Sequence, residues 1–129
     1  MADVGQLNIH SYKNLRSQEI QQVPLFQHEE LHAELLVIPP GQSIGRHSHP
    51  DRHELLDVVE GSGTMEVGGL VCRGAPGKCL FVPADTPHSL HNDTERPWVL
   101  RVTYQERLFP RHLGRLVVRA LRGRLTRWL

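Results

Sequence analysis

Residues 41–61 read GQSIGRHSHPDRHELLDVVEG, and within this stretch His47, His49 and Glu54 decide how the chain is interpreted. Side chains of an extended segment alternate between its two faces, so the imidazoles of His47 and His49 are expected on the same side. A third imidazole, His88, follows later in the chain. Three imidazoles and one carboxylate suit a divalent first-row transition metal that keeps open coordination positions. The sequence therefore predicts a metal site.

The composition is that of a single soluble globular domain. The chain has 129 residues, of which 39% are hydrophobic and 22% charged, a size that closes one hydrophobic core but not two. No stretch approaches the roughly 20 apolar residues of a transmembrane helix. The first residues, Met1 to Gln6, have neither the basic lead nor the apolar run of a signal peptide. We therefore expect a cytoplasmic protein.

The two cysteines, Cys72 and Cys79, are too few for a framework of disulfides. In a cytosolic chain both thiols stay reduced. We expect two small buried side chains rather than a redox pair.

Short apolar runs alternate with glycine and proline through residues 32–106. The runs span residues 32–38, 55–59, 64–67, 70–72, 80–82 and 99–104. Runs of this length and spacing are typical of an antiparallel sandwich or barrel. Residues 1–31 are weakly periodic, with a turn expected at Pro24, and we expect them to form a short strand or helical extension that packs on the barrel.

A second block of spaced residues lies at 77–92, which read GKCLFVPADTPHSLHN. The spaced positions of the two blocks are Gly41, His47, His49, Glu54 and Gly61, then Gly77, Pro83, Asp85, His88 and Asn92. In order and separation the two blocks closely resemble the signature motifs of the cupin superfamily, and the resemblance covers residues 32–105. It departs from the family pattern at Asp85, where glycine is usual. We expect a left-handed turn there, which Asp tolerates better than most residues.

The resemblance implies an all-β fold, a double-stranded β-helix (cupin or jelly-roll) barrel made of two antiparallel sheets. It also implies that His47, His49, Glu54 and His88 bind the metal, in agreement with the donor pattern. One divalent ion per chain, iron, manganese, nickel or zinc, would keep about two octahedral positions open. The superfamily includes dioxygenases, decarboxylases, isomerases, lyases and non-enzymatic binders, so the resemblance predicts the fold more sharply than the chemistry.

Strand alternation predicts which neighbours of the ligands face the cavity. The residues expected to face inward are Leu56, Val58, Leu90 and Asn92, and those expected to face outward are His53, Asp57 and His91. The cavity is then small and mostly apolar. Such a cavity favours a small chelating or anionic ligand over a sugar, which usually requires an aromatic platform.

Two classes of function remain open. In the first, the chain is a small metal-dependent enzyme of the dioxygenase, isomerase or lyase type. The base is then a metal-bound hydroxide or Tyr104, the candidate catalytic residue, and the alternative role of Tyr104 is packing at the end of the barrel. The motif strands offer no second carboxylate for the role of base. In the second, the chain is a non-catalytic cupin that binds a metal or small ligand as a sensor or partner module. The complete set of four ligands favours the enzyme.

The charge is divided unevenly along the chain. Residues 1–106 hold 8 Lys and Arg against 14 Asp and Glu, a balance of −6, whereas residues 107–129 hold seven arginines and no acid. Apolar residues recur at helical spacing after Pro110, which predicts an amphipathic helix over 111–122 at the start of a basic segment. We expect this segment to pack on the barrel or on a second copy in a homodimer. Contact with a membrane surface is a weaker alternative, and nucleic-acid binding is not expected because no binding motif accompanies the charge.

Overall fold

The computed structural model describes residues 5–106, and the C-terminal helix expected over 111–122 lies outside this range. Within these residues, one 3-10 helix precedes nine strands. They are η1 (Ile9–Ser11), β1 (Gln21–His28), β2 (Leu31–Ile38), β3 (Ser43–His47), β4 (Arg52–Glu60), β5 (Gly63–Val67), β6 (Leu70–Gly74), β7 (Cys79–Val82), β8 (His88–His91) and β9 (Trp98–Glu106). Over the same residues, no helix has the length and apolar character needed to span a bilayer.

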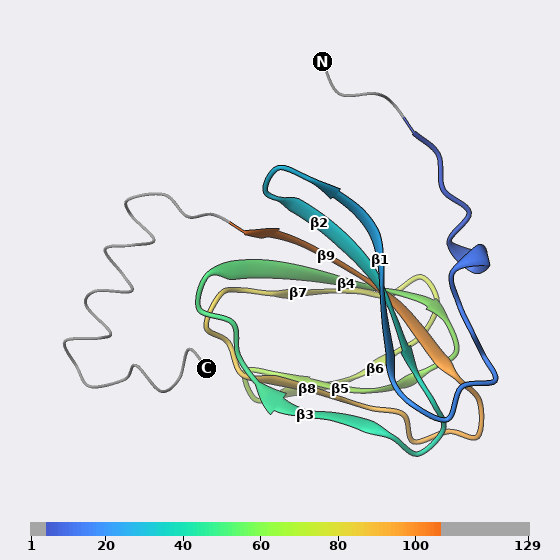
Figure 1. Cartoon of the computed structure of the whole chain (residues 1–129). Helices are drawn as coiled ribbons and strands as arrows, with labels where there is room; N and C mark the ends of the chain where they lie inside the picture. Colours follow the sequence, from blue (N-terminus) through green and yellow to red (C-terminus); the bar gives the residue numbers. More distant parts are fainter. Residues whose placement is uncertain (1–4, 107–129) are drawn as a thin grey trace.

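The strands form two antiparallel sheets that face each other (Figure 1). The five-stranded sheet has the order β1-β2-β9-β4-β7, and the four-stranded sheet has the order β3-β8-β5-β6. Strands far apart in the sequence are neighbours, since β2 pairs with β9 and β3 pairs with β8. The predicted all-β jelly-roll barrel is confirmed, and strand formation extends over each apolar run noted in the sequence.

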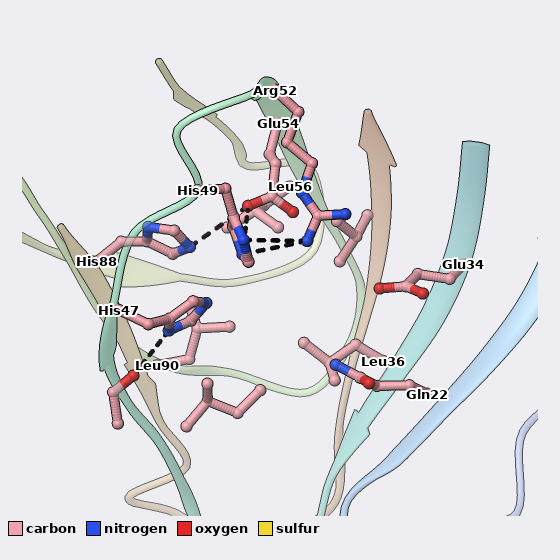
Figure 2. A pocket seen from close by; sticks show the side chains of 13 residues that line it. Gln22, Glu34, Leu36, His47, His49, Arg52, Glu54, Leu56, His88 and Leu90 are labelled. Atoms are coloured by element: carbon pink, nitrogen blue, oxygen red, sulfur yellow. Dashed lines mark hydrogen bonds and ion pairs between the residues drawn. The ribbon is translucent and has the colours of Figure 1, made fainter. Parts of the chain in front are cut away.

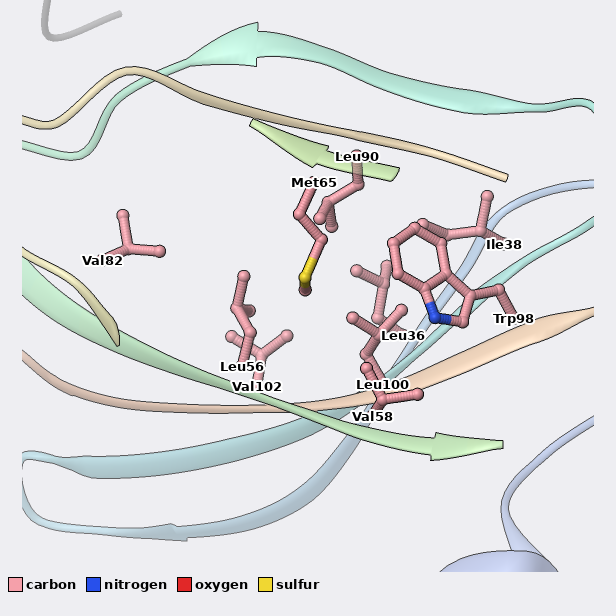
Figure 3. Close-up of a cluster of buried hydrophobic side chains, with 10 residues drawn as sticks. All are labelled: Leu36, Ile38, Leu56, Val58, Met65, Val82, Leu90, Trp98, Leu100 and Val102. Carbon is pink, nitrogen blue, oxygen red and sulfur yellow. The ribbon is translucent and has the colours of Figure 1, made fainter. Parts of the chain in front are cut away.

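The main core fills the space between the two sheets (Figure 3). Its buried members are Leu36, Ile38, Leu56, Val58, Met65, Val82, Leu90, Trp98, Leu100 and Val102. Members on one strand are two residues apart, as the period of a strand requires. Trp98 is fully buried, and a Cβ added to Gly63 would lie 2.3 Å from its ring. The indole thus occupies space that a larger residue at position 63 would need.

The motif residues of the two blocks hold the turns that join the sheets. Gly61 has φ +76°, and a Cβ there would lie 2.3 Å from the carbonyl oxygen of Pro97. Asp85 has φ 68°, so the left-handed turn expected at this departure from the family pattern is confirmed. Asn92 is fully buried and donates from Nδ2 to the carbonyl oxygens of Ile38, at 2.8 Å, and Arg96, at 2.7 Å.

The turn expected at Pro24 is wrong. Pro24 lies within β1, beside a register shift between Pro24 and Phe26. Because β1 is an edge strand, a residue without an N–H is tolerated there, and proline in sheets is largely confined to edges and bulges.

The cysteines are not both buried, contrary to expectation. Both are free thiols, Cys72 is half-buried and Cys79 is exposed on β7. Cys79 alternates with the inward Leu80 and Val82, so its side chain faces away from the core.

Candidate metal site

Three imidazoles meet at one end of the barrel. His47 ends β3 and His88 opens β8, and the two residues are direct partners in the register of these strands. His49 follows two residues after His47 in the connection to β4. One ring nitrogen of each histidine lies within 4.8 Å of those of the other two. The structure thus brings together the three histidines that the sequence predicted as ligands.

Glu54 completes the cluster from the five-stranded sheet. Its carboxylate is buried, and Oε1 lies 3.4 Å from Nε2 of His49 and 3.4 Å from Nε2 of His88. Glu54 faces inward because it alternates on β4 with the outward His53 and Leu55. All four predicted ligands therefore face the same small volume (Figure 2).

Backbone carbonyls orient two of the imidazoles. Nδ1 of His47 donates to the carbonyl oxygen of Gly45 at 2.8 Å, and Nδ1 of His88 donates to that of Thr86 at 2.9 Å. A carbonyl only accepts, so the proton is on Nδ1 and Nε2 remains for the interior. This outer hydrogen bond is typical of histidines that bind metals, because it fixes the ring and its tautomer.

The electrostatics of the cluster suit a cation. Burial lowers the pKa of His49 to about 4, so this imidazole is neutral at pH 7. Burial alone would raise the pKa of Glu54, but hydrogen bonding with His88 and the charges of His49 and Arg52 lower it overall. Burial would likewise lower the pKa of His88, but hydrogen bonding with Glu54 raises it. The His88–Glu54 contact therefore favours a proton between the two side chains. A metal ion bound by the same two groups would displace this proton.

The donor chemistry fits a divalent transition metal. Three imidazoles, two of them with a defined tautomer, and one ionised carboxylate are borderline ligands of the kind that iron, manganese, nickel and zinc bind. His53 is not part of the set, because its Nδ1 accepts a hydrogen bond from the backbone N–H of Ala84 at 2.9 Å on the outer side. The expected outward direction of His53 is thus confirmed.

A cavity of about 390 Å³ opens beside the cluster (Figure 2). Its lining residues are Gln22, Glu34, Leu36, Ile44, Gly45, His47, His49, Arg52, Glu54, Leu56, His88, Leu90 and Val102. Leu56 and Leu90 line it as expected. Val58 does not, because it lies further along β4 and packs in the core. The lining is mostly apolar, as expected, and Gln22, Glu34 and Arg52 add polar groups that the sequence analysis did not place there.

Sequence reasoning missed these three residues for different reasons. Arg52 lies two residues before Glu54, so strand alternation could have placed both on one face. Glu34 lies two residues before Leu36, so the same alternation could have placed the side chains of Glu34 and Leu36 on one face of their strand. Gln22 lies on β1, a strand with no clear pattern in the sequence, and could not have been found.

Tyr104, the candidate catalytic residue, lies beside the cavity and is not one of its lining residues. Its ring stacks on the imidazole of His32 with centroids 4.8 Å apart, and the guanidinium carbon of Arg52 lies 4.1 Å from its centroid. Burial raises the pKa of the phenol, so it is protonated at neutral pH. A catalytic role of Tyr104 stays a prediction.

Comparison with known proteins adds a family and a set of similar structures. The family model described as "Cupin domain" matches residues 34–104. No curated protein matches the chain significantly.

Several solved structures share the fold. TT1209 from Thermus thermophilus is 26% identical, with a TM-score of 0.73 over 79% of this chain and 97% of that one. KdgF from a Halomonas species is 22% identical, with a TM-score of 0.69 over 81% of this chain and 96% of that one. The Cupin_2 domain of an XRE family transcriptional regulator from Enterobacter cloacae is 20% identical, with a TM-score of 0.64 over 70% of this chain and 99% of that one.

Proposed function

Because the chain belongs to the cupin family, we propose that its cluster of three histidines and Glu54 binds one divalent transition metal and that the protein is a metal-dependent enzyme. The substrate is a small anionic or chelating molecule, and the reaction is of the dioxygenase, isomerase or lyase type. One observation carries this proposal: ligands from β3, β4 and β8 and the loop after β3 converge beside a cavity of about 390 Å³. Cavities of this size accommodate small molecules.

A metal bound by the four ligands would act as a Lewis acid that polarises the substrate. The protein's own contribution is to orient two of the imidazoles and to keep the third one unprotonated. His47 and His88 are oriented by backbone carbonyls, and the low pKa of His49 keeps its ring unprotonated. A metal that binds would therefore find three oriented or unprotonated imidazoles and would displace the proton that the His88–Glu54 contact favours.

Arg52 supplies the recognition of an anion. In the part of the chain that the structure describes, the arginines with a carboxylate in ion-pair range are Arg46, Arg73 and Arg101. Arg52 instead faces the cavity, and its Nε is buried without a hydrogen-bond acceptor. Charged side chains withdrawn from water usually have a partner, and an anionic substrate next to the metal would provide one.

Tyr104 is proposed as the proton donor at the margin of the cavity. Its protonated phenol suits a donor better than a base. The stacking contacts with His32 and Arg52 give it a second role, which is to hold the guanidinium in place.

A ligand-sensing module is the second candidate. The likeness to a cupin domain of a transcriptional regulator favours it, since the same fold occurs there in a regulatory protein. A sensor would bind the small anion at the same cluster without turning it over, so turnover separates the two candidates.

The first test is elemental analysis of the untagged protein by plasma mass spectrometry. The wild-type chain is expected to retain about one divalent ion, and His49→Ala is expected to lose most of it, because one of the four ligands is removed. His28→Ala is the matched control, since His28 is exposed and outside the cluster. Full metal content in His49→Ala would overturn the assigned site.

The identity of the metal directs the search for turnover. Iron would lead to oxygen-consumption screens with small acids and thiols, and zinc, nickel or manganese to isomerase and lyase assays. Metal binding without turnover of any chelating acid would favour the sensor.

A further inference from the structure

The cavity has a second polar wall opposite the histidines. His47 and His88 belong to strands of the four-stranded sheet, whereas Glu34 and Gln22 lie on β2 and β1 of the five-stranded sheet. Figure 2 shows Glu34 across the cavity from the imidazoles of His47 and His88. A ligand held at the metal cluster therefore has a carboxylate of the opposite sheet facing its other end.

Among residues 5–106, no direct hydrogen bond or ion pair explains the position of Glu34, and the charge of Arg52 acts on it only from a greater distance. Its neighbours in the cross-strand register are Pro24 on β1 and Val102 on β9, and Leu36 follows it on the inward face of β2. Within residues 5–106 its carboxylate makes no hydrogen bond or ion pair, and the side chain is half-buried. A half-buried carboxylate without a hydrogen-bond donor gives up part of its hydration for no contact within the barrel. The position is explained if a ligand supplies the missing donor.

The charges around Glu34 favour a hydrogen-bond donor next to its carboxylate. Burial raises the pKa of Glu34, the charge of Glu54 raises it further, and the charges of Arg52 and His32 lower it. A hydroxyl or ammonium group that donates to Glu34 would relieve the unfavourable burial of its charge. The carboxylate end of the same ligand would lie at the other wall, next to Arg52 and the metal cluster.

We propose that Glu34 determines substrate specificity, and that the substrate is a small bifunctional acid. Its carboxylate binds at the metal and Arg52, and its hydroxyl or ammonium group, at the opposite end, donates a hydrogen bond to Glu34. This inference rests on the proposed function, because it uses the metal cluster as the anchor of the carboxylate. The cavity volume of about 390 Å³ limits the ligand to a short acid.

The test uses the full-length chain loaded with Co(II), whose visible absorption responds to ligands that enter the coordination sphere. Unsubstituted straight-chain acids from propanoate to hexanoate are titrated beside the corresponding ω-hydroxy and ω-amino acids. At the best-fitting length, the substituted acid is expected to bind about tenfold more tightly than the unsubstituted one, the gain typical of one hydrogen bond to a charged group.

Two variants and one control assign that preference to Glu34. Glu34→Leu is expected to abolish it while the cobalt content stays unchanged. Glu34→Gln keeps the shape and an acceptor, so it should lose any preference for the ammonium and retain part of that for the hydroxyl. Glu95→Gln changes an exposed carboxylate outside the cavity and should behave as the wild type.

Equal affinity for substituted and unsubstituted acids at every length would overturn the inference. An unchanged preference in Glu34→Leu would overturn it as well. Failure of the wild-type chain to bind cobalt is a different result, because it would overturn the proposed metal site itself. Circular dichroism of each variant verifies that the barrel is folded.

Discussion

Arg52 places its Nη2 atom 3.2 Å from both ring nitrogens of His49, so a permanent cation lies against one of the four proposed metal ligands. A guanidinium group only donates hydrogen bonds, whereas a neutral imidazole offers one accepting nitrogen. The contact therefore favours the unprotonated ring, which is the form that binds a metal. The same arginine faces the cavity, so one residue acts on both the ligand set and the substrate.

The first prediction concerns the titration of His49 in the metal-free protein. Its pKa is expected at about 4, well below the ordinary 6.5, with burial as the largest cause and Arg52 as a further one. Arg52→Gln is expected to raise this pKa but leave it below 6.5, because the ring stays buried. NMR titration of the imidazole signals measures both values, and a wild-type midpoint near 6.5 would contradict the prediction.

The same shift has a consequence for stability. Between about pH 4 and 6.5 the unfolded chain binds a proton at His49 that the folded chain does not bind. The contribution of His49 to the free energy of unfolding therefore falls as the pH drops through this range, and His49→Gln should remove that contribution. Urea unfolding of both metal-free proteins at several pH values checks the sign.

The second prediction separates the ring of Tyr104 from its hydroxyl. Tyr104→Phe keeps the aromatic face under Arg52 and is expected to keep the affinity for a short carboxylate, whereas Tyr104→Leu is expected to lose affinity several-fold. A cation–π contact of this kind is worth about 0.5–2 kcal/mol. Titration of the cobalt-loaded variants measures this difference.

The hydroxyl is then tested by turnover. If the phenol is the proton donor, Tyr104→Phe binds substrate normally and turns it over slowly. Equal turnover in wild type and Tyr104→Phe would leave the ring contact as the sole role of this residue.

The third prediction concerns Asn92, whose amide joins the ends of several strands. Its Nδ2 donates to the carbonyls of Ile38 and Arg96, and its Oδ1 accepts from the backbone N–H of Thr94 at 3.0 Å and from the hydroxyl of Thr94 at 2.7 Å. Asn92→Ala leaves these groups without partners, at about 1–3 kcal/mol for each buried one. Chemical denaturation should show a loss of several kcal/mol, against a small change in Asn14→Ala, where the side chain is exposed. A change below about 1 kcal/mol would show that the amide is dispensable.

The fourth prediction concerns the basic segment at residues 107–129. It holds seven arginines, whereas residues 1–106 have a balance of −6, so we propose that it pairs with the acidic barrel of a second copy in a homodimer. Truncation after Glu106 is expected to shift the protein towards monomer, as measured by analytical ultracentrifugation, while the metal content stays the same. An unchanged oligomeric state would contradict this pairing, and binding of the full chain to lipid vesicles would then be measured.

The sequence by itself determined the proposed ligand set and much of the fold. Strand alternation decided that Glu54 and Leu56 face inward and that His53 faces outward, because a strand presents successive side chains to opposite faces whatever its neighbours are. The resemblance to the cupin motifs, in which glycine is usual at this position, also placed the turn at Asp85, since few residues accept a positive φ.

Only the tertiary structure decided what surrounds the ligands. Strand alternation predicts which face of the sheet a side chain lies on, but not how far along the barrel it lies. Val58 therefore faces inward as predicted, and yet it packs in the core and does not line the cavity. Glu34 and Arg52 line the same cavity as the histidines because β2 and β4 both pair with β9, and the register of these pairs is set by packing between distant strands. That register depends on contacts across the whole barrel, and no local pattern in the chain encodes it.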